Sequence, residues 1–213
     1  MLKKTNERFS LIGFAIVIVI ALFSSSCAVG TTKLKISHGP LQTATAKKEG
    51  TVLVKQFVDN RKATEYIGNK RNGFGMVMGH VGTMGGVKLE VLLTKYFAEA
   101  LQEAGYKTVI EEANVSQTEA PENFDAIIDG EILVFWMDLY MAVWHRIEVK
   151  VRALDPLKQD VLWEDVIKGA EKRTLWVGAT AEYERIIREA MTKALNRAVE
   201  EFSSSEFYKA IKP

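Results

Sequence analysis

Cysteine is almost absent from this sequence: the chain of 213 residues contains only one, Cys27. A single thiol excludes an intramolecular disulfide, so the fold must be stabilised by burial of apolar side chains. Histidine is also scarce. The three histidines, His38, His80 and His145, do not have the spacing of a zinc site. We expect no cofactor.

Motifs that carry common enzyme chemistry are also missing. No glycine-rich stretch ends in Gly-Lys-Ser or Gly-Lys-Thr, and Met78 stands where the third glycine of a G-x-G-x-x-G motif starting at Gly73 would be. No G-x-S-x-G sequence is present to hold a nucleophilic serine. These absences predict that the protein is not an enzyme.

The net charge has little excess of either sign. The formal charge of the whole chain is +1, and 26% of its residues are charged. This balance gives no electrostatic reason to expect binding to nucleic acid. With 47% hydrophobic residues, the composition is that of an ordinary globular domain.

The N-terminus carries the first positive signal. Lys3, Lys4 and Arg8 precede an uncharged apolar run from Leu11 to Phe23. This run is shorter than the roughly 20 residues that cross a bilayer comfortably, and it suits a secretory signal. The alternative is an N-terminal anchor helix that is not cleaved.

Small residues lead from this run to Cys27 in a pattern that resembles a bacterial lipobox. Ser24 stands where lipoboxes usually have Leu, so the match is incomplete. The resemblance implies that residues 1–26 are removed and that Cys27 receives the lipid. Because Ala28 and not Asp follows the cysteine, we expect sorting to the bacterial outer membrane, with the protein facing the periplasm.

The remaining chain is predicted to be a lipidated tether over 27–50, with at most one short strand, and a single domain over 51–213. Seven glycines make 68–86 a predicted long loop. Apolar periodicity predicts long helices over 87–104, with Gly105 as C-cap, and over 179–202. Ser203 to Glu206 has the spacing of a capping box before a short terminal helix. Strands are predicted over 51–58, 106–110, 126–136, 146–154 and 161–168.

The resulting order is β-α-β-β-β-β-α. It predicts an α+β fold, in the wider sense of α/β, built as a two-layer sandwich. The expected sheet is largely antiparallel, with four to five strands and two long helices on one face.

Four stretches together resemble the YajG family of uncharacterised bacterial lipoproteins. They are the lipobox and the segments 100–107, 124–131 and 205–212. The resemblance covers most of the mature chain, in pattern more than in identical residues. It implies a periplasm-facing domain on the outer membrane and gives no catalytic residues. We therefore expect a non-catalytic binding or scaffolding module with an unknown envelope protein as partner. The alternative is an auxiliary lipoprotein of an envelope lipid-transport or secretion system.

The segment 135–144 is the candidate interaction site. It must turn near its middle without Gly, Pro or Asn, and it is rich in aromatic residues and methionine. Apolar side chains at a turn indicate a surface for a partner or a membrane. The candidate residues are Trp136, Tyr140, Met141 and Trp144.

Two further groups are weaker candidates. Met76, Met78, His80 and Met84 offer soft ligands that suit Cu(I), although methionine also fills apolar gaps. Asp129 and Glu131 share one face of a predicted strand, as paired acid and base groups would. The favoured interpretation of this pair is a solvated sheet face with Arg and Lys on the neighbouring strand.

Overall fold

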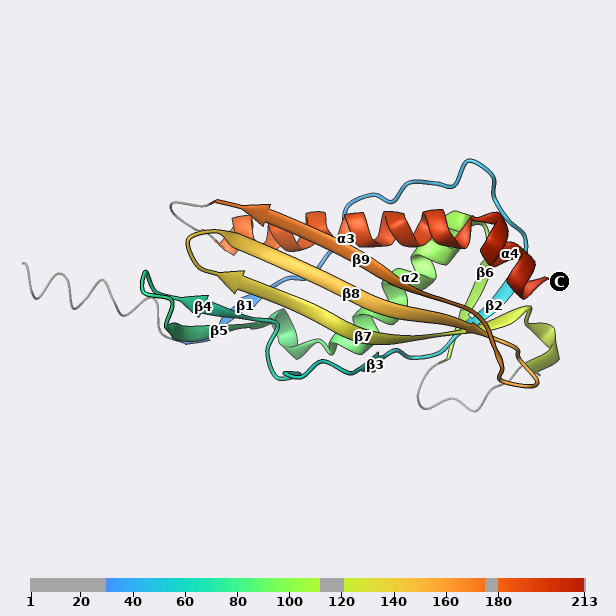
Figure 1. Ribbon diagram of the computed structural model, residues 1–213, viewed down its shortest axis with the longest axis horizontal. Coiled ribbons are helices and arrows are strands. Elements are labelled where there is room, and N and C mark those ends of the chain that lie inside the picture. Colours follow the sequence, from blue (N-terminus) through green and yellow to red (C-terminus); the bar gives the residue numbers. More distant parts are fainter. Residues whose placement is uncertain (1–29, 112–120, 175–179, 213) are drawn as a thin grey trace, which may run out of the picture.

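A computed structural model of the chain describes residues 30–111, 121–174 and 180–212. These residues form a curled, open, mixed sheet of nine strands, covered on one face by helices (Figure 1). The strands are β1 (Thr32–Leu34), β2 (Thr51–Val54), β3 (Val58–Asp59), β4 (Gly68–Arg71), β5 (Val77–Thr83), β6 (Lys107–Ile110), β7 (Ala126–Leu139), β8 (Val143–Leu154) and β9 (Val161–Arg173). The helices are α2 (Leu89–Ala104), α3 (Thr180–Phe202) and α4 (Ser205–Ile211), with short 3-10 turns at Met84–Gly86 and Pro121–Asn123.

Strand β7 organises the sheet because it is long enough to pair with several strands along one edge. The short strands β2, β3 and β4 lie in succession along that edge, all parallel to β7. On its other edge β7 pairs antiparallel with β8, and β8 pairs antiparallel with β9. Beyond the short strands, β6 lies parallel to β2, and β5 lies between β4 and β1. Local hairpins and long crossovers therefore share one sheet.

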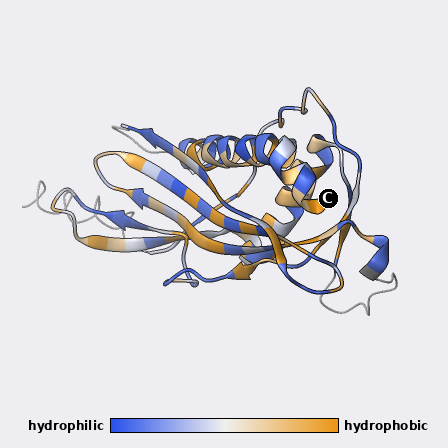
Figure 2. Cartoon of the chain, turned by 45° about the vertical axis from the view of Figure 1, so that its right-hand side comes forward, coloured by the Kyte–Doolittle hydropathy of each residue, from blue (hydrophilic) through white to orange (hydrophobic). Residues whose placement is uncertain are grey.

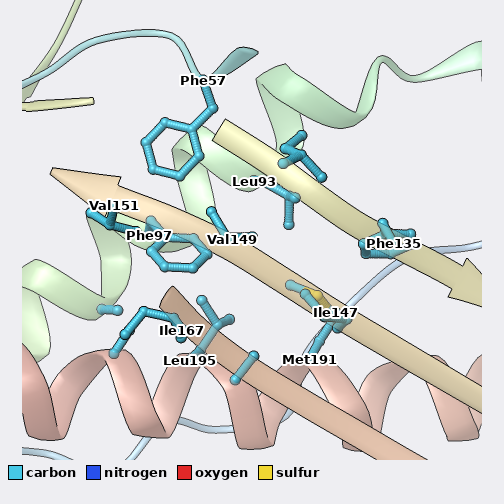
Figure 3. Packing of buried hydrophobic residues seen from close by; sticks show 14 of the residues in the cluster. Phe57, Leu93, Phe97, Phe135, Ile147, Val149, Val151, Ile167, Met191 and Leu195 are labelled. Atoms are coloured by element: carbon cyan, nitrogen blue, oxygen red, sulfur yellow. The ribbon is translucent and has the colours of Figure 1, made fainter. Parts of the chain in front are cut away.

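The core lies between the sheet and the helices. One cluster of buried side chains extends from Leu34 to Ile211, and Figure 3 shows Phe97, Val149 and Leu195 meeting in its interior. Apolar side chains that recur at helical spacing along α3 are buried: Ile186, Ile187, Ala190, Met191, Ala194, Leu195, Ala198 and Phe202. The helical period in the sequence thus identified the packed face of α3.

The predicted cap at the end of α2 is confirmed, and the predicted cap at the start of α4 is shifted by one residue. Gly105 caps α2 in the left-handed conformation, with φ 110°, and its N–H donates to the carbonyl of Leu101. The cap of α4 was misplaced by one residue. Ser204, not Ser203, is the N-cap, and its hydroxyl accepts from the N–H of Phe207. The hydroxyl of Ser203 instead donates to the carbonyl of Glu200.

The predicted sheet was wrong in size and in direction. The antiparallel meander from β7 to β9 is confirmed, and the two long helices pack against each other and the same core. However, the described sheet has nine strands rather than four or five, and β2, β3 and β4 run parallel to β7. Of the strands before α2, the one that begins at Thr51 was predicted. Strands β3 and β4 were not recognised, because two to four residues are too few to show a period, and the glycines of β5 indicated a loop.

The described part of the predicted tether packs onto the domain. Residues 32–34 pair with β5, and Leu34 and Ile36 are buried in the core. The segment then crosses both long helices: the N–H of Gly39 donates to the hydroxyl of Thr192 (2.8 Å), and the N–H of Lys48 donates to the carbonyl of Ala104 (3.0 Å). A flexible tether over 27–50 is therefore wrong for these residues.

The predicted glycine-rich loop over 68–86 is a hairpin. Strands β4 and β5 pair antiparallel, and their glycines allow close approach of backbones. A Cβ on Gly68 would collide with the carbonyl oxygen of Met137, and one on Gly79 with that of Gly30. The turn itself needs Gly75, which has φ +83°.

The face of the long strands opposite the helices is polar. Hydrophobic and hydrophilic residues alternate along β8 (Figure 2), so that Ile147, Val149 and Val151 face the helices. On the open face Arg152 forms ion pairs with Asp129 (2.8 Å) and Glu131 (3.4 Å). The hydrogen bond with Asp129 raises the pKa of the Arg152 guanidinium. This ion-pair ladder confirms the favoured interpretation of the two carboxylates.

Candidate functional site

Two hairpin turns meet at one end of the sheet. The β4–β5 turn and the β7–β8 turn lie at the end of the molecule where β1 begins, opposite the C-terminus (Figure 1). The hydroxyl of Tyr140 donates to the carbonyl of Gly73 (3.1 Å), and the Arg71 guanidinium pairs with the Asp138 carboxylate (3.0 Å). These contacts join turns that are far apart in the sequence.

Large apolar side chains at these turns point into solvent. Phe74 is 89% exposed and Met141 is 69% exposed. We call the exposed apolar residues of the two turns the tip surface, which consists of Phe74, Met76, Val77, Tyr140 and Met141. Exposing a large apolar side chain forgoes about 1.5–3 kcal/mol of burial, which favours a role in contact with another surface.

The β4–β5 turn presents Phe74 by means of ordered hydrogen bonds. The side-chain oxygen of Asn72 accepts from the N–H groups of Phe74 and Met76, both at 3.0 Å. Arg71 donates to the carbonyl of Gly75 (3.0 Å). Phe74 was missed in the sequence, yet Asn72-Gly73 between two short strands is a hairpin signal that would have placed it at a turn.

The four predicted interaction residues divide into two pairs. Tyr140 and Met141 belong to the tip surface. Trp136 and Trp144 are half-buried on the open sheet face, where Trp136 lies opposite Arg146 and the Arg146 guanidinium lies 5.1 Å from the Trp144 ring centroid. Phe135, Met137, Leu139 and Val143 face the helices and are buried. Strand alternation therefore hides half of the segment and leaves the two tryptophans on the outer face.

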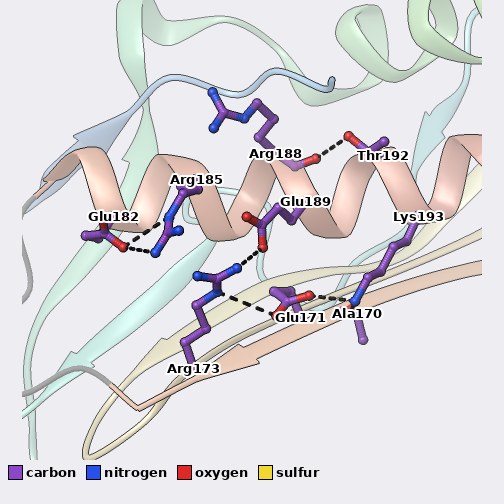
Figure 4. Close-up of polar contacts among 9 residues, drawn as sticks. All are labelled: Ala170, Glu171, Arg173, Glu182, Arg185, Arg188, Glu189, Thr192 and Lys193. Atoms are coloured by element: carbon purple, nitrogen blue, oxygen red, sulfur yellow. Dashed lines mark hydrogen bonds and ion pairs between the residues drawn. The ribbon is translucent and has the colours of Figure 1, made fainter. Parts of the chain in front are cut away.

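A shallow groove adjoins Trp144 and continues over the edge of β9. Its volume is about 590 Å³, and it is lined by Trp144, His145, Arg146, Ala170, Glu171, Lys172 and Lys193. Figure 4 shows how its floor is fixed to α3: Glu171 pairs with Lys193 (2.6 Å), and Arg173 pairs with Glu189 (2.6 Å). The hydrogen bond from Lys193 lowers the pKa of Glu171. The groove combines an aromatic wall with cationic side chains.

The predicted methionine and histidine ligands do not converge. Met76 and Met84 lie just beyond opposite ends of β5, which separates them by roughly 25 Å at the rise of an extended strand. The four residues therefore cannot surround one ion. His80 is instead stacked on Tyr66, with ring centroids 4.0 Å apart, and its Nδ1 lies 3.0 Å from the Asn69 side-chain oxygen. Within the described ranges no three His, Cys, Asp or Glu side chains form a metal-binding group.

A polar cleft of about 530 Å³ lies beside the 60–67 segment and the start of α2. Its arginine, Arg61, is 8% exposed and serves the fold. The guanidinium donates to the Asp59 carboxylate and to the carbonyls of Thr64, Tyr66 and Phe135, which engages all five of its N–H groups. Arg61 thus has no donor left for a ligand.

The predicted lipid site, Cys27, lies outside the described residues. The first described residue, Gly30, packs against Gly79 of β5, close to the tip surface. In the part of the chain that the structure covers, no helix is long and apolar enough to cross a membrane.

Comparison with known proteins identifies similarity at the level of the fold. No family model matches this chain. No curated protein matches it either. Among solved structures, protein XCC0632 from Xanthomonas campestris, of family DUF330, is 13% identical with a TM-score of 0.51 over 79% of this chain and 91% of its own. This likeness shows a shared fold.

Two further solved structures are similar to this chain with lower TM-scores. A homologue of the neuraminyllactose-binding hemagglutinin from Helicobacter pylori is 12% identical, with a TM-score of 0.45 over 82% of this chain and 95% of its own. Lipoprotein GNA1162 from Neisseria meningitidis is 14% identical, with a TM-score of 0.37 over 64% of this chain and 92% of its own. Membership of the YajG family stays a prediction from the sequence.

Proposed function

We propose that this protein is a non-catalytic, lipid-anchored module of the bacterial cell envelope that binds a protein partner. The observation that carries the binding role is the pair of tryptophans around Arg146 on a sheet face that no described helix covers. Trp and Arg dominate the binding energy of protein interfaces, because they combine large apolar area with directed polar contacts. The anchoring role rests on the signal and lipobox pattern that ends at Cys27.

Photo-crosslinking in living cells tests the binding role. A photoreactive residue at Lys172, beside the Trp144 groove, should give a discrete adduct with one envelope protein. The matched control carries the photoreactive residue at position 158, because Lys158 lies in the exposed turn before β9 at the other end of the sheet. This control should give no such adduct. Trp144→Ala and Arg146→Gln should each remove the Lys172 adduct while the chain stays folded. An adduct that survives both substitutions would place the partner elsewhere.

Processing of the chain tests the anchor. Cys27→Ala should accumulate an unprocessed precursor, because cleavage of a lipoprotein signal follows modification of its cysteine. Normal maturation and unchanged fractionation of this variant would contradict lipidation. We further propose location in the outer membrane, facing the periplasm, because Ala28 follows Cys27. Density-gradient fractions that peak with inner-membrane markers would contradict that location.

An auxiliary role in lipid transport or secretion is the second candidate. It is favoured by an apolar groove of about 370 Å³ between β1, the end of β5 and α2, lined by Leu34, Lys35, Ile36, Thr83, Met84, Val87 and Leu92. A fluorescent fatty acid should then bind the purified chain, and Met84→Glu should abolish that binding. Equal binding of the fatty acid by the native chain and by Met84→Glu would contradict the lipid role and leave protein binding as the proposed function.

A further inference from the structure

The tip surface lies where the lipid anchor must leave the domain. Gly30 follows Cys27 by three residues, a distance of at most about 11 Å in a fully extended chain. Gly30 itself packs against Gly79 of β5, two residues beyond the strand end that adjoins the tip surface. An acyl chain on Cys27 would therefore hold this end of the molecule, and not the end that carries the C-terminus, next to the bilayer.

The chemistry of this end suits a phospholipid surface. Aromatic and methionine side chains with a polar backbone behind them resemble the residues that enter the region between head groups and acyl chains. Strands β4 and β5 and the turn between them contain Lys70 and Arg71 and no acidic residue, although Arg71 pairs with Asp138 of β7. On the open face behind the tips, Arg146 and Lys172 are also exposed. These cations favour an anionic lipid surface.

The opposite end of the same sheet provides a contrast. The β8–β9 turn there contains Asp155, Lys158 and Asp160. The exposed large apolar side chains at this turn are Leu157, at 70%, and Val161 at the start of β9, at 55%. The Asp155 carboxylate accepts from the N–H groups of Leu157 and Lys158, both at 2.8 Å. This polar turn is separated from the tip surface by the length of β8, which is about 40 Å for 12 residues.

We infer that the tip surface docks on the membrane that holds the lipid of Cys27, so that the sheet stands end-on to the bilayer with Phe74 and Met141 in the interfacial region. This inference rests on the lipidation of Cys27 in the proposed function. Docking leaves the groove beside Trp144 facing sideways, just above the membrane surface. A partner bound there would be an envelope protein that is itself close to the same bilayer.

Labelled thiols provide the test. The lipid on Cys27 occupies the one native thiol, so an introduced cysteine is the one thiol that a fluorophore can label. Phe74→Cys and Leu157→Cys are each purified as the lipidated full chain, labelled with an environment-sensitive fluorophore, and reconstituted in vesicles of phosphatidylethanolamine and phosphatidylglycerol. We expect the label at position 74 to shift to the blue, to brighten several-fold and to be quenched by bromine-labelled lipid. The label at position 157 should behave as in water.

The outcomes separate the two proposals. A water-like label at position 74, in a protein whose mass shows the lipid and which floats with vesicles, would overturn membrane docking and leave the anchor intact. A mass without lipid would overturn the anchor, and docking with it. A label at position 74 that is shielded from water in whole envelopes but not on vesicles would indicate that the tip surface contacts a protein. That result would overturn membrane docking.

Discussion

The hydroxyl of Tyr140 donates to the carbonyl of Gly73 across the two turns of the tip surface (3.1 Å). This contact links β4–β5 to β7–β8 at their free ends. Tyr140→Phe keeps the ring and removes the hydrogen bond. Because the contact is exposed, we expect a loss of at most about 1 kcal/mol in the free energy of unfolding.

Amide exchange reports the local effect of that substitution. The amides of Phe74 and Gly75 should exchange faster in Tyr140→Phe, while those of Val149 and Val151, in the centre of the sheet, stay slow. Unchanged exchange at the β4–β5 turn would show that Arg71 and Asn72 alone fix its position.

Strand β9 and helix α3 approach each other closely at Gly169. A Cβ there would collide with the carbonyl oxygen of Ala190 and lie 2.7 Å from the Cβ of Ala194. Gly169→Ala should therefore lower the free energy of unfolding by about 1–3 kcal/mol, because helix and strand must separate. Gly73→Ala is the matched control, since nothing lies within 4 Å of its added Cβ. Equal midpoints of urea unfolding for the two variants would contradict this account.

The sequence predicted the elements whose residues repeat over long stretches. Helix α3 and strands β7 and β8 have more than ten residues each, so their periods of 3.6 and 2 are well sampled. The open face of the sheet followed from the same alternation. Gly105 identified the end of α2, because the chain leaves the helix in the left-handed conformation, which glycine adopts readily.

The missing parts depend on contacts between distant residues. Gly68 and Gly79 permit backbones to touch, whereas in the sequence they indicated a loop. The segment before β2 looked flexible because its polar composition does not reveal the partners that hold it, such as Thr192 on α3. Likewise, the tip surface joins turns whose contacting residues are 67 positions apart in the sequence. No local pattern could bring Phe74 beside Tyr140.

The ion pairs between β9 and α3 should differ in strength from those on the exposed surface of α3. Glu171 is 14% exposed and contacts both Lys193 and Arg173. Glu171→Gln should lower the free energy of unfolding by about 1–2 kcal/mol at low salt. The control Arg197→Gln removes more exposed pairs with Glu200 and Glu201 and should cost less than about 0.5 kcal/mol. Equal losses in chemical denaturation would contradict the difference in burial.

His145 makes the stability of the domain sensitive to acid. Its side chain is fully buried beside Phe135, and neither ring nitrogen has a hydrogen-bond partner among the described residues. Burial lowers the pKa of His145 from 6.5 to about 3, although the nearby backbone of Trp136 partly offsets this effect. The folded protein therefore holds this imidazole neutral between about pH 3 and pH 6.5, where the unfolded chain would protonate it.

The direction of the pH dependence follows from this difference. Below pH 6.5 the unfolded state binds a proton at His145 that the folded state refuses until about pH 3, so the free energy of unfolding falls as the pH is lowered between these values. The expected slope from this one group is on the order of 1.4 kcal/mol per pH unit near pH 4–6. His145→Leu should reduce the dependence of the free energy of unfolding on pH by that amount below pH 6.5. Its free energy of unfolding at pH 7 should stay the same or rise. Urea unfolding at pH 7, 6, 5 and 4 measures both effects. An equal dependence on pH in His145→Leu and in the native protein would contradict the role of His145 in acid sensitivity.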